Sequence, residues 1–391
     1  IFIRMNTLFD LINPFFAIIM LLASGQAMTS VILLLYNRKK QYSNSMLALW
    51  CGIWGTSCFF FFAFIQGAPV FSRPLMAFIG PLVPISLFPP LYLYVKHLFY
   101  EQKAFTKGDF IHFIPVLVTI LFSIYIYLDS GADTELMRKH ALYHFRSLAT
   151  SYIAAIQGLF YFIWIRKILT KQEQKLKNEY SDIEEMKLSW VHVINNLSLP
   201  VMIIGTLSAV VKSTPFDPYL LFIAYHLCMA FCLYYISFQL VLHPISLTGK
   251  KMEYSVDNVF VIASQKEELK IVTEEQTPVY EQIIKELQEL MEKKQCFRDQ
   301  DICLQDLAEE LSISRNQLSY ALNHHLNTSF YDYINELRVK DVKQRMQNPK
   351  YAHYSILAIA LDSGFKSKTV FYRFFKQVEG ITPSEYRSSL K

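Results

Sequence analysis

LQDLAEELSISRNQLSYAL, residues 304–322, decides the fold of the C-terminal part of the chain together with a second stretch, SILAIALDSGFKSKTVFYRFFKQ, residues 355–377. In both, apolar residues recur every three or four positions, as on the buried face of a helix. Midway through each, a short turn is followed by a serine, Ser314 or Ser367, whose hydroxyl can cap a second helix. Each stretch therefore predicts two short helices joined by a tight turn, and Gly364 suits a turn position with positive φ.

The segments around these stretches are also predicted to be helical. Residues 330–346 form one continuous helical pattern, closed by Asn348 and Pro349. At about 1.5 Å per residue this helix is about 25 Å long, so it would set the distance between the two stretches. Residues 278–291 carry apolar side chains on one helical face. That face either packs on the following domain or forms a dimer seam, and we favour packing because two heptads are too few to specify a coiled coil.

Most of the chain before His243 is apolar. Hydrophobic residues make up 52% of the 391, and they are concentrated between about residues 8 and 242. A membrane-spanning helix needs about 20 mostly apolar residues, because its backbone must be satisfied within about 30 Å of hydrocarbon. Seven segments meet this requirement: 14–36, 45–65, 76–95, 110–128, 148–165, 193–211 and 219–242. The third contains several prolines, so we expect a kink there.

The positive residues in the loops predict an orientation, because Lys and Arg are retained on the cytoplasmic side of a membrane. One alternating set of predicted loops holds twelve of them, between Arg38 and Lys187, and the opposite set holds six, between Arg4 and Lys212. The excess places the N-terminus outside, and seven crossings then place the C-terminal part in the cytoplasm. We expect an all-α protein with a seven-helix transmembrane domain at 1–242, a cytoplasmic linker at 243–277 and a helical domain at 278–391, its core at 304–387.

The C-terminal stretches are basic, although the residues before them are acidic. Residues 311–391 contain 12 Lys and Arg against 6 Asp and Glu, whereas residues 279–310 contain 4 against 9. A positive surface confined to the paired helices suits contact with the phosphates of DNA. The alternative, a solvated face on a protein-interaction domain, is the less favoured interpretation.

Five short motifs follow one another across about a hundred C-terminal residues. They are Leu307-Ala308, Leu337-Arg338, Ile359-Ala360-x-x-x-Gly364-Phe365, Phe371-x-x-x-Phe375-Lys376 and Gly380-x-Thr382-Pro383-x-x-Tyr386-Arg387. In this order and spacing they resemble the AraC/XylS type of helix-turn-helix transcriptional regulator. The apolar half is similar, in its general hydropathy alone, to the seven-helix sensor modules of some bacterial members.

The resemblance implies that the second helix of each unit enters the major groove of double-stranded DNA. The candidate DNA-binding residues are Arg315, Asn316, Ser319, Tyr320, Lys366, Ser367, Lys368, Thr369, Tyr372, Arg373 and Lys376. Tyr320 departs from the family pattern, because many members carry arginine there. A tyrosine hydroxyl cannot make the bidentate contact to guanine that arginine makes, which weakens the prediction of base reading by the first unit.

Polar side chains within the apolar segments normally face a helix bundle or a cavity, since burying them unpaired in lipid is costly. Four are candidates for ligand contact, although an interhelical hydrogen bond is the favoured explanation for each: Gln26, Gln157, His226 and Gln239. The six cysteines form no disulfide framework or metal pattern, and the chain shows no catalytic motif. We therefore expect no metal, no cofactor and no enzyme activity.

Together these patterns predict a one-component transcription regulator tethered in the inner membrane of a bacterium. A signal at the bundle, whether small molecule, lipid or protein, would bias the seventh helix and act on the DNA-binding part through the linker. A homodimer is left open. The alternative is a transporter or membrane enzyme with a fused regulatory DNA-binding domain, and a third hypothesis is that the tether is cut.

Overall fold

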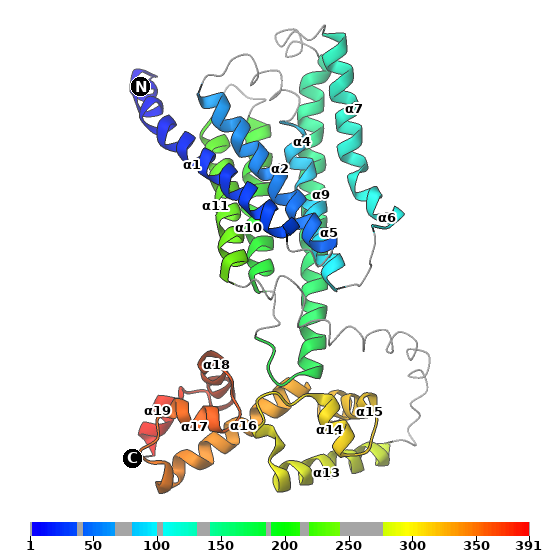
Figure 1. Ribbon diagram of the computed structural model, residues 1–391, viewed down its shortest axis with the longest axis vertical. Helices are drawn as coiled ribbons and strands as arrows, with labels where there is room; N and C mark the ends of the chain where they lie inside the picture. The colour runs from blue at the N-terminus through cyan, green and yellow to red at the C-terminus, as the bar shows by residue number, and fades with distance from the viewer. Residues whose placement is uncertain are drawn as a thin grey trace. The chain divides into compact units, whose positions relative to one another are not determined.

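The computed structural model describes residues 2–36, 42–66, 80–99, 105–130, 141–184, 189–211, 219–242 and 277–390 (Figure 1). In this part of the chain the regular structure is helical, and the β contacts amount to one isolated antiparallel bridge between Tyr180 and Cys303. The predicted all-α fold is therefore confirmed for these residues. Two compact units are formed, one by residues 1–170 with 188–253 and the other by residues 171–187 with 254–391. The expected linker lies outside the described residues as far as residue 276.

The first unit consists of apolar helices. They are α1 (Phe2–Tyr36), α2 (Tyr42–Ile65), α4 (Leu82–Ser86), α5 (Phe88–Phe99), α6 (Lys107–Phe110), η1 (Ile111–Phe113), α7 (Ile114–Asp129), α9 (Ala141–Glu179), α10 (Ser189–Val211) and α11 (Tyr219–Leu242). Six stretches among the described residues are long and apolar enough to cross a membrane: Asn13–Tyr36, Tyr42–Ala63, Lys107–Asp129, Leu148–Glu179, Ser189–Ser208 and Leu220–Val241. Large apolar side chains are exposed on the outside of these helices; Ile156 and Val241, for example, are 72% and 71% exposed. Such faces suit lipid better than water.

The third expected span is broken into α4 and α5. Pro89 and Pro90 lie in the first turn of α5, and neither can donate a backbone hydrogen bond to the preceding turn. α4 therefore ends at Ser86, and a new helix starts at Phe88. The kink expected from the prolines is thus present as a break. Because neither short helix has the length of a membrane span, the predicted count of seven spanning helices is not confirmed; the described residues contain six.

Small residues allow the helices of the first unit to approach closely. A Cβ atom at Gly55 of α2 would lie 2.3 Å from the Cβ of Ala27 on α1. One at Gly158 of α9 would lie 2.6 Å from the ring of Phe88 on α5. Close backbone contact of this kind holds helices together in lipid, where the hydrophobic effect does not drive their association.

The second unit contains two helix-turn-helix units joined by a long helix. Its helices are α13 (Thr277–Lys294), η4 (Cys296–Arg298), α14 (Leu304–Glu310), α15 (Arg315–Tyr320), η5 (Ala321–His325), α16 (Phe330–Gln347), η6 (Pro349–Tyr351), α17 (Ile356–Asp362), α18 (Lys368–Glu379) and α19 (Pro383–Ser389). We call α14 with α15 the first reading unit and α17 with α18 the second. α16, which corresponds to the helix predicted over residues 330–346, joins them in the chain (Figure 1).

The amphipathic helix predicted before the reading units is α13. Its apolar face is buried at Tyr280, Ile283, Leu287 and Met291, in one core with Leu307 of α14. The apolar side of this helix is therefore covered by residues of the same chain. Of the two alternatives for this face, packing on the following domain is the one that the structure supports.

The turns and caps of both reading units follow the predicted chemistry. Ser314 accepts a hydrogen bond from the backbone amide of Gln317 at 3.2 Å, and Ser367 accepts one from the amide of Val370 at 3.2 Å. Gly364 has a φ of 99°, a conformation that side-chain-bearing residues rarely adopt. Both serine caps and the positive-φ glycine are confirmed.

Candidate nucleic-acid interface and candidate sensing site

α18 separates a buried face from a basic face. Its buried residues are Val370, Phe371, Phe374 and Phe375. The predicted DNA-contacting residues that are exposed on α18 or just before it are Lys366, Lys368, Thr369, Arg373 and Lys376, while Ser367 and Tyr372 are half-buried. Because a helix repeats every 3.6 residues, the aromatic anchors fix which way the basic side chains point. The second reading unit thus presents a positive surface held rigidly by its own core.

α15 is less open than α18. Leu318 is buried, and the predicted DNA-contacting residues of this helix are all half-buried: Arg315, Asn316, Ser319 and Tyr320. The ring of Tyr320 stacks on that of His324, with centroids 4.2 Å apart, and lies 4.8 Å from the ring of Tyr280. Tyr320 therefore helps to pack α13 against the first reading unit, and base reading by its hydroxyl stays a prediction.

The two arginines in the predicted set both contact carboxylates. Arg315 donates a hydrogen bond to Glu179 at 2.5 Å. Arg373 donates one to Glu184 at 3.0 Å and another to the hydroxyl of Tyr331 at 2.8 Å. One arginine belongs to each reading unit, and both carboxylates come from the segment around the end of α9. Nothing in the sequence patterns indicated this pairing.

Two lysines of the predicted DNA-binding set make weaker contacts than the arginines. Lys366 forms an ion pair with Asp301, whose side chain is 83% exposed. The Lys368 ammonium lies 5.6 Å from the centroid of the Tyr372 ring. Contacts of such exposed charges contribute little, typically below about 1 kcal/mol, so a phosphate could replace them at small cost.

Arg338 of α16 contacts both the segment that precedes the first reading unit and the turn of the second. It is 1% exposed, and it donates hydrogen bonds to the backbone carbonyls of Phe297 and Asp299, both at 2.7 Å. Its guanidinium also lies 5.9 Å from the centroid of the Phe365 ring, in the turn of the second reading unit. Burial lowers the pKa of Arg338 to about 10, so the side chain remains charged at neutral pH.

The role of Arg338 as a buried connector was not predicted. The sequence did place it in a motif, Leu337-Arg338, inside a helical segment. Buried arginines must have their donors satisfied by acceptors, and here carbonyls distant in sequence supply them. From that requirement one could have predicted that Arg338 is a packing residue. The carbonyls to which it donates could not have been predicted.

Comparisons with known proteins match this part of the chain. Residues 307–389 fit the family model of a helix-turn-helix domain. The chain is 34% identical over 87 residues to the raffinose operon transcriptional regulatory protein RafR of Pediococcus pentosaceus, a match covering 22% of this chain and 30% of that protein. It is 31% identical over 86 residues, 22% of this chain and 30% of the relative, to the Msm operon regulatory protein of Streptococcus mutans. It is 29% identical over 89 residues, 23% of this chain and 28% of the relative, to the melibiose operon regulatory protein of Escherichia coli.

These findings identify the domain. The C-terminal part of the chain carries an AraC/XylS-type helix-turn-helix domain. This confirms the resemblance drawn from the five motifs. The matched region spans less than a third of the length of these curated relatives, and no solved structure matches the chain.

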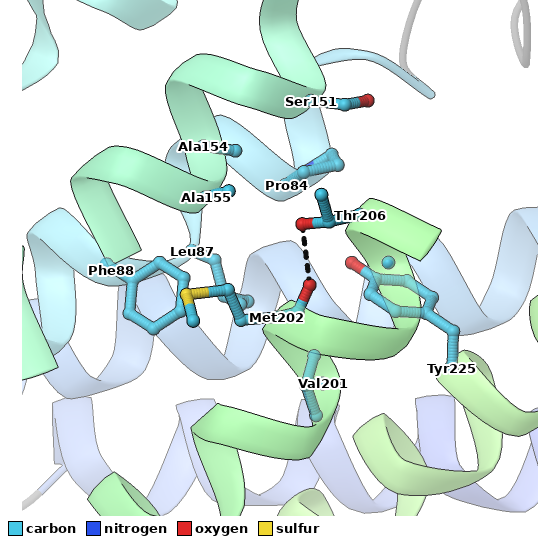
Figure 2. A pocket seen from close by; sticks show the side chains of 11 residues that line it. Pro84, Leu87, Phe88, Ser151, Ala154, Ala155, Val201, Met202, Thr206 and Tyr225 are labelled. Carbon is cyan, nitrogen blue, oxygen red and sulfur yellow. Dashed lines mark hydrogen bonds between the residues drawn. The ribbon is translucent and has the colours of Figure 1, made fainter. Parts of the chain in front are cut away.

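Upstream of the AraC/XylS-type domain, the first unit contains a small cavity between α4, α9, α10 and α11 (Figure 2). Its lining is mostly apolar, with Leu87, Ala154 and Val201 among the wall residues. The hydroxyl of Tyr225 is buried there and has no hydrogen-bond partner among the described residues. The volume is about 30 Å³, room for two or three water molecules, since one needs about 10–15 Å³. At this size the cavity does not fit a sugar or another metabolite of similar bulk.

None of the four polar candidates of the first unit is among the residues that line this cavity. Gln26 is exposed on α1 and accepts a hydrogen bond from Thr29. His226 is 3% exposed and donates from Nδ1 to the carbonyl of Phe222 at 2.9 Å. Gln157 and Gln239 each lie one turn from a tyrosine on their own helix. The structure thus gives Gln26 and His226 partners within their own helices, and ligand contact by any of the four stays a prediction.

Proposed function

We propose that this protein is a membrane-tethered transcription regulator that binds specific double-stranded DNA through its two reading units, under the control of a signal received by its apolar helices. The observation that carries the proposal is the presence of both parts in one chain. Residues 307–389 match a helix-turn-helix domain, and six preceding stretches have the length and apolarity of membrane spans. The printed names of the relatives describe operon regulators, which supports a regulatory role.

In the proposed complex α15 and α18 enter the major groove at neighbouring turns of one duplex. α16 has 18 residues and is therefore about 27 Å long, close to the roughly 34 Å between successive major-groove sites on one DNA face. The exposed residues Lys368, Thr369 and Arg373 would face bases or phosphates, whereas half-buried α15 would contribute Arg315 and Asn316. The candidate residues of α18 are more exposed than those of α15, which supports a larger contribution of the second reading unit to DNA recognition.

We place the apolar helices in the inner membrane of a bacterium, with the N-terminus outside and the AraC/XylS-type domain in the cytoplasm. In this arrangement α4 and α5 together make one broken crossing, since residues 82–99 include both helices and 18 residues are near the length that a span needs. The break itself fits such a crossing only where protein covers it, and α4 and α5 are largely buried. The signal could be a small molecule, a lipid or a protein.

The test uses the full chain in lipid nanodiscs and a DNA fragment found by genome-wide mapping of bound sites. Arg373→Ala should weaken binding to that fragment by about tenfold or more, as loss of a bidentate base contact does. Lys376→Ala should lower the slope of log affinity against log salt by about 0.9, the value of one phosphate contact. Gln377→Ala is the matched control, because Gln377 is exposed on α18 and uncharged. Unchanged affinity and salt slope in both the lysine and the arginine variant would refute this docking.

A further inference from the structure

The C-terminal end of α9 and the residues after it, 171–187, belong to the same compact unit as the AraC/XylS-type domain. We call residues 171–184 the α9 tail; it comprises the last turns of α9 and the non-helical residues that follow. Leu176 and Ile183 of the tail are 8% and 0% exposed, in a core shared with Val342 of α16 and Phe371 of α18. Because burial of apolar side chains is the main force that holds a fold together, the tail is an integral part of the second unit.

Polar bonds hold the tail in one register. The backbone carbonyl of Ser181 accepts a hydrogen bond from Asn335 at 3.0 Å, and the Ser181 hydroxyl bonds to Arg338 at 3.2 Å. Tyr180 forms the antiparallel bridge with Cys303, at the start of the first reading unit. Asn335 and Arg338 are both buried, so these contacts are shielded from water.

In this register the tail places one carboxylate on each reading unit. Glu179 meets Arg315, with side chains that are 15% and 19% exposed. Glu184 meets Arg373, with side chains that are 32% and 44% exposed. A guanidinium that bonds a carboxylate uses the same N–H donors that would bond a phosphate or a guanine edge. The two carboxylates therefore occupy N–H donors that a DNA contact by these arginines would use.

We propose that the α9 tail and DNA compete for Arg315 and Arg373, so that DNA binding requires Glu179 and Glu184 to withdraw. This inference rests on the proposed function, because it assumes that these arginines contact DNA. α9 is one continuous helix from Ala141 to Glu179, and Glu179, which pairs with Arg315, is the last residue of its stretch of membrane-span length, Leu148–Glu179. A change at that helix can therefore act on the DNA-binding surface through α9 itself.

The experiment compares full-length variants in nanodiscs for binding to a fluorescent 40-base-pair duplex of mixed sequence. The Glu179→Gln, Glu184→Gln double variant keeps the size of both side chains and removes both negative charges. It should bind about five- to thirtyfold more tightly than the unaltered chain, since each ion pair is worth up to about 1 kcal/mol. Glu173→Gln is a control for the loss of a negative charge elsewhere in the tail, and it is compared with each single variant, Glu179→Gln and Glu184→Gln; Glu173 pairs with Lys177 of the same helix. This control changes the net charge by one without touching either arginine and should leave the affinity unchanged.

A reversible disulfide between the α9 tail and the first reading unit gives a second measurement. Residues opposed in an antiparallel bridge have Cα atoms about 4.5–5.5 Å apart, a spacing that a disulfide can close. Tyr180→Cys should therefore cross-link to Cys303 on oxidation, lower the affinity for the duplex at least tenfold and regain it on reduction, whereas the unaltered chain should show no such cycle.

The outcomes separate the two proposals. Salt-dependent binding by the unaltered chain with equal affinity in the double variant would overturn the competition and leave the DNA-binding proposal standing. Absence of salt-dependent binding in every variant, the reduced cysteine variant included, would overturn the proposed function and the competition with it.

Discussion

Replacing Gly364 by alanine should disrupt the AraC/XylS-type domain far more than the same change at Gly380. Both glycines have positive φ, 99° and 75°, so alanine is strained at either by about 1–2 kcal/mol. At Gly380 a new Cβ would meet no atom within 4 Å. At Gly364 it would lie 2.6 Å from the carbonyl oxygen of Phe297 and 2.8 Å from Nε of Arg338.

Nε of Arg338 donates a hydrogen bond to the carbonyl oxygen of Phe297 at 2.7 Å. A shift that relieves the clash with the new Cβ therefore also disturbs this buried, charge-assisted hydrogen bond. Overpacking costs about 1–3 kcal/mol and loss of a hydrogen bond to a charged group about 1.5–3 kcal/mol. We therefore expect Gly364→Ala to destabilise the second unit by about 4 kcal/mol and Gly380→Ala by about 1 kcal/mol.

The assay is hydrogen–deuterium exchange of the full chain in nanodiscs, read on peptides from α16 and α18. Since about 1.4 kcal/mol corresponds to a factor of ten, exchange of the most protected amides should accelerate about a thousandfold in Gly364→Ala and about fivefold in Gly380→Ala. Equal acceleration in the two variants would refute the reasoning, because it would mean that the positive φ alone, and not the contact with Phe297 and Arg338, sets the requirement for glycine.

Two further predictions concern packing and topology. Leu287→Ala, at a fully buried position of α13, should destabilise the second unit by about 2–5 kcal/mol without changing the oligomeric mass measured by light scattering; a loss of dimer mass would instead indicate that this face is an intermolecular seam. A tag fused after Lys391 should be protected from protease in intact spheroplasts and cleaved after lysis, and cleavage in intact spheroplasts would contradict the proposed orientation.

Local chemistry explains what could be predicted from the sequence. The caps at Ser314 and Ser367, the positive φ at Gly364 and the long helix of residues 330–346 each depend on neighbours within a few positions, which the sequence displays directly. The basic face of α18 was predictable for the same reason, because its aromatic residues fix the orientation of the helix.

Contacts between distant segments explain what could not be predicted. The α9 tail has the composition of a charged loop, and its register depends on bonds from Ser181 to Asn335 and Arg338, more than 150 positions later. Likewise, the apolar content of residues 76–95 matched a membrane span, but Pro89 and Pro90 interrupted the helix there. Hydropathy measures the preference for lipid, whereas helix continuity depends on individual backbone amides.

The burial of Arg338 has a consequence for the operator that this protein would recognise. The Arg338 guanidinium bonds residues that precede the first reading unit and lies against the turn of the second, so we expect the two units to keep a fixed spacing on DNA. With about 10–10.5 base pairs per turn of the duplex, inserting one base pair between half-sites rotates one against the other by about 35°. We therefore expect DNA binding to tolerate base substitutions between the two half-sites and to be lost when the number of base pairs between them changes.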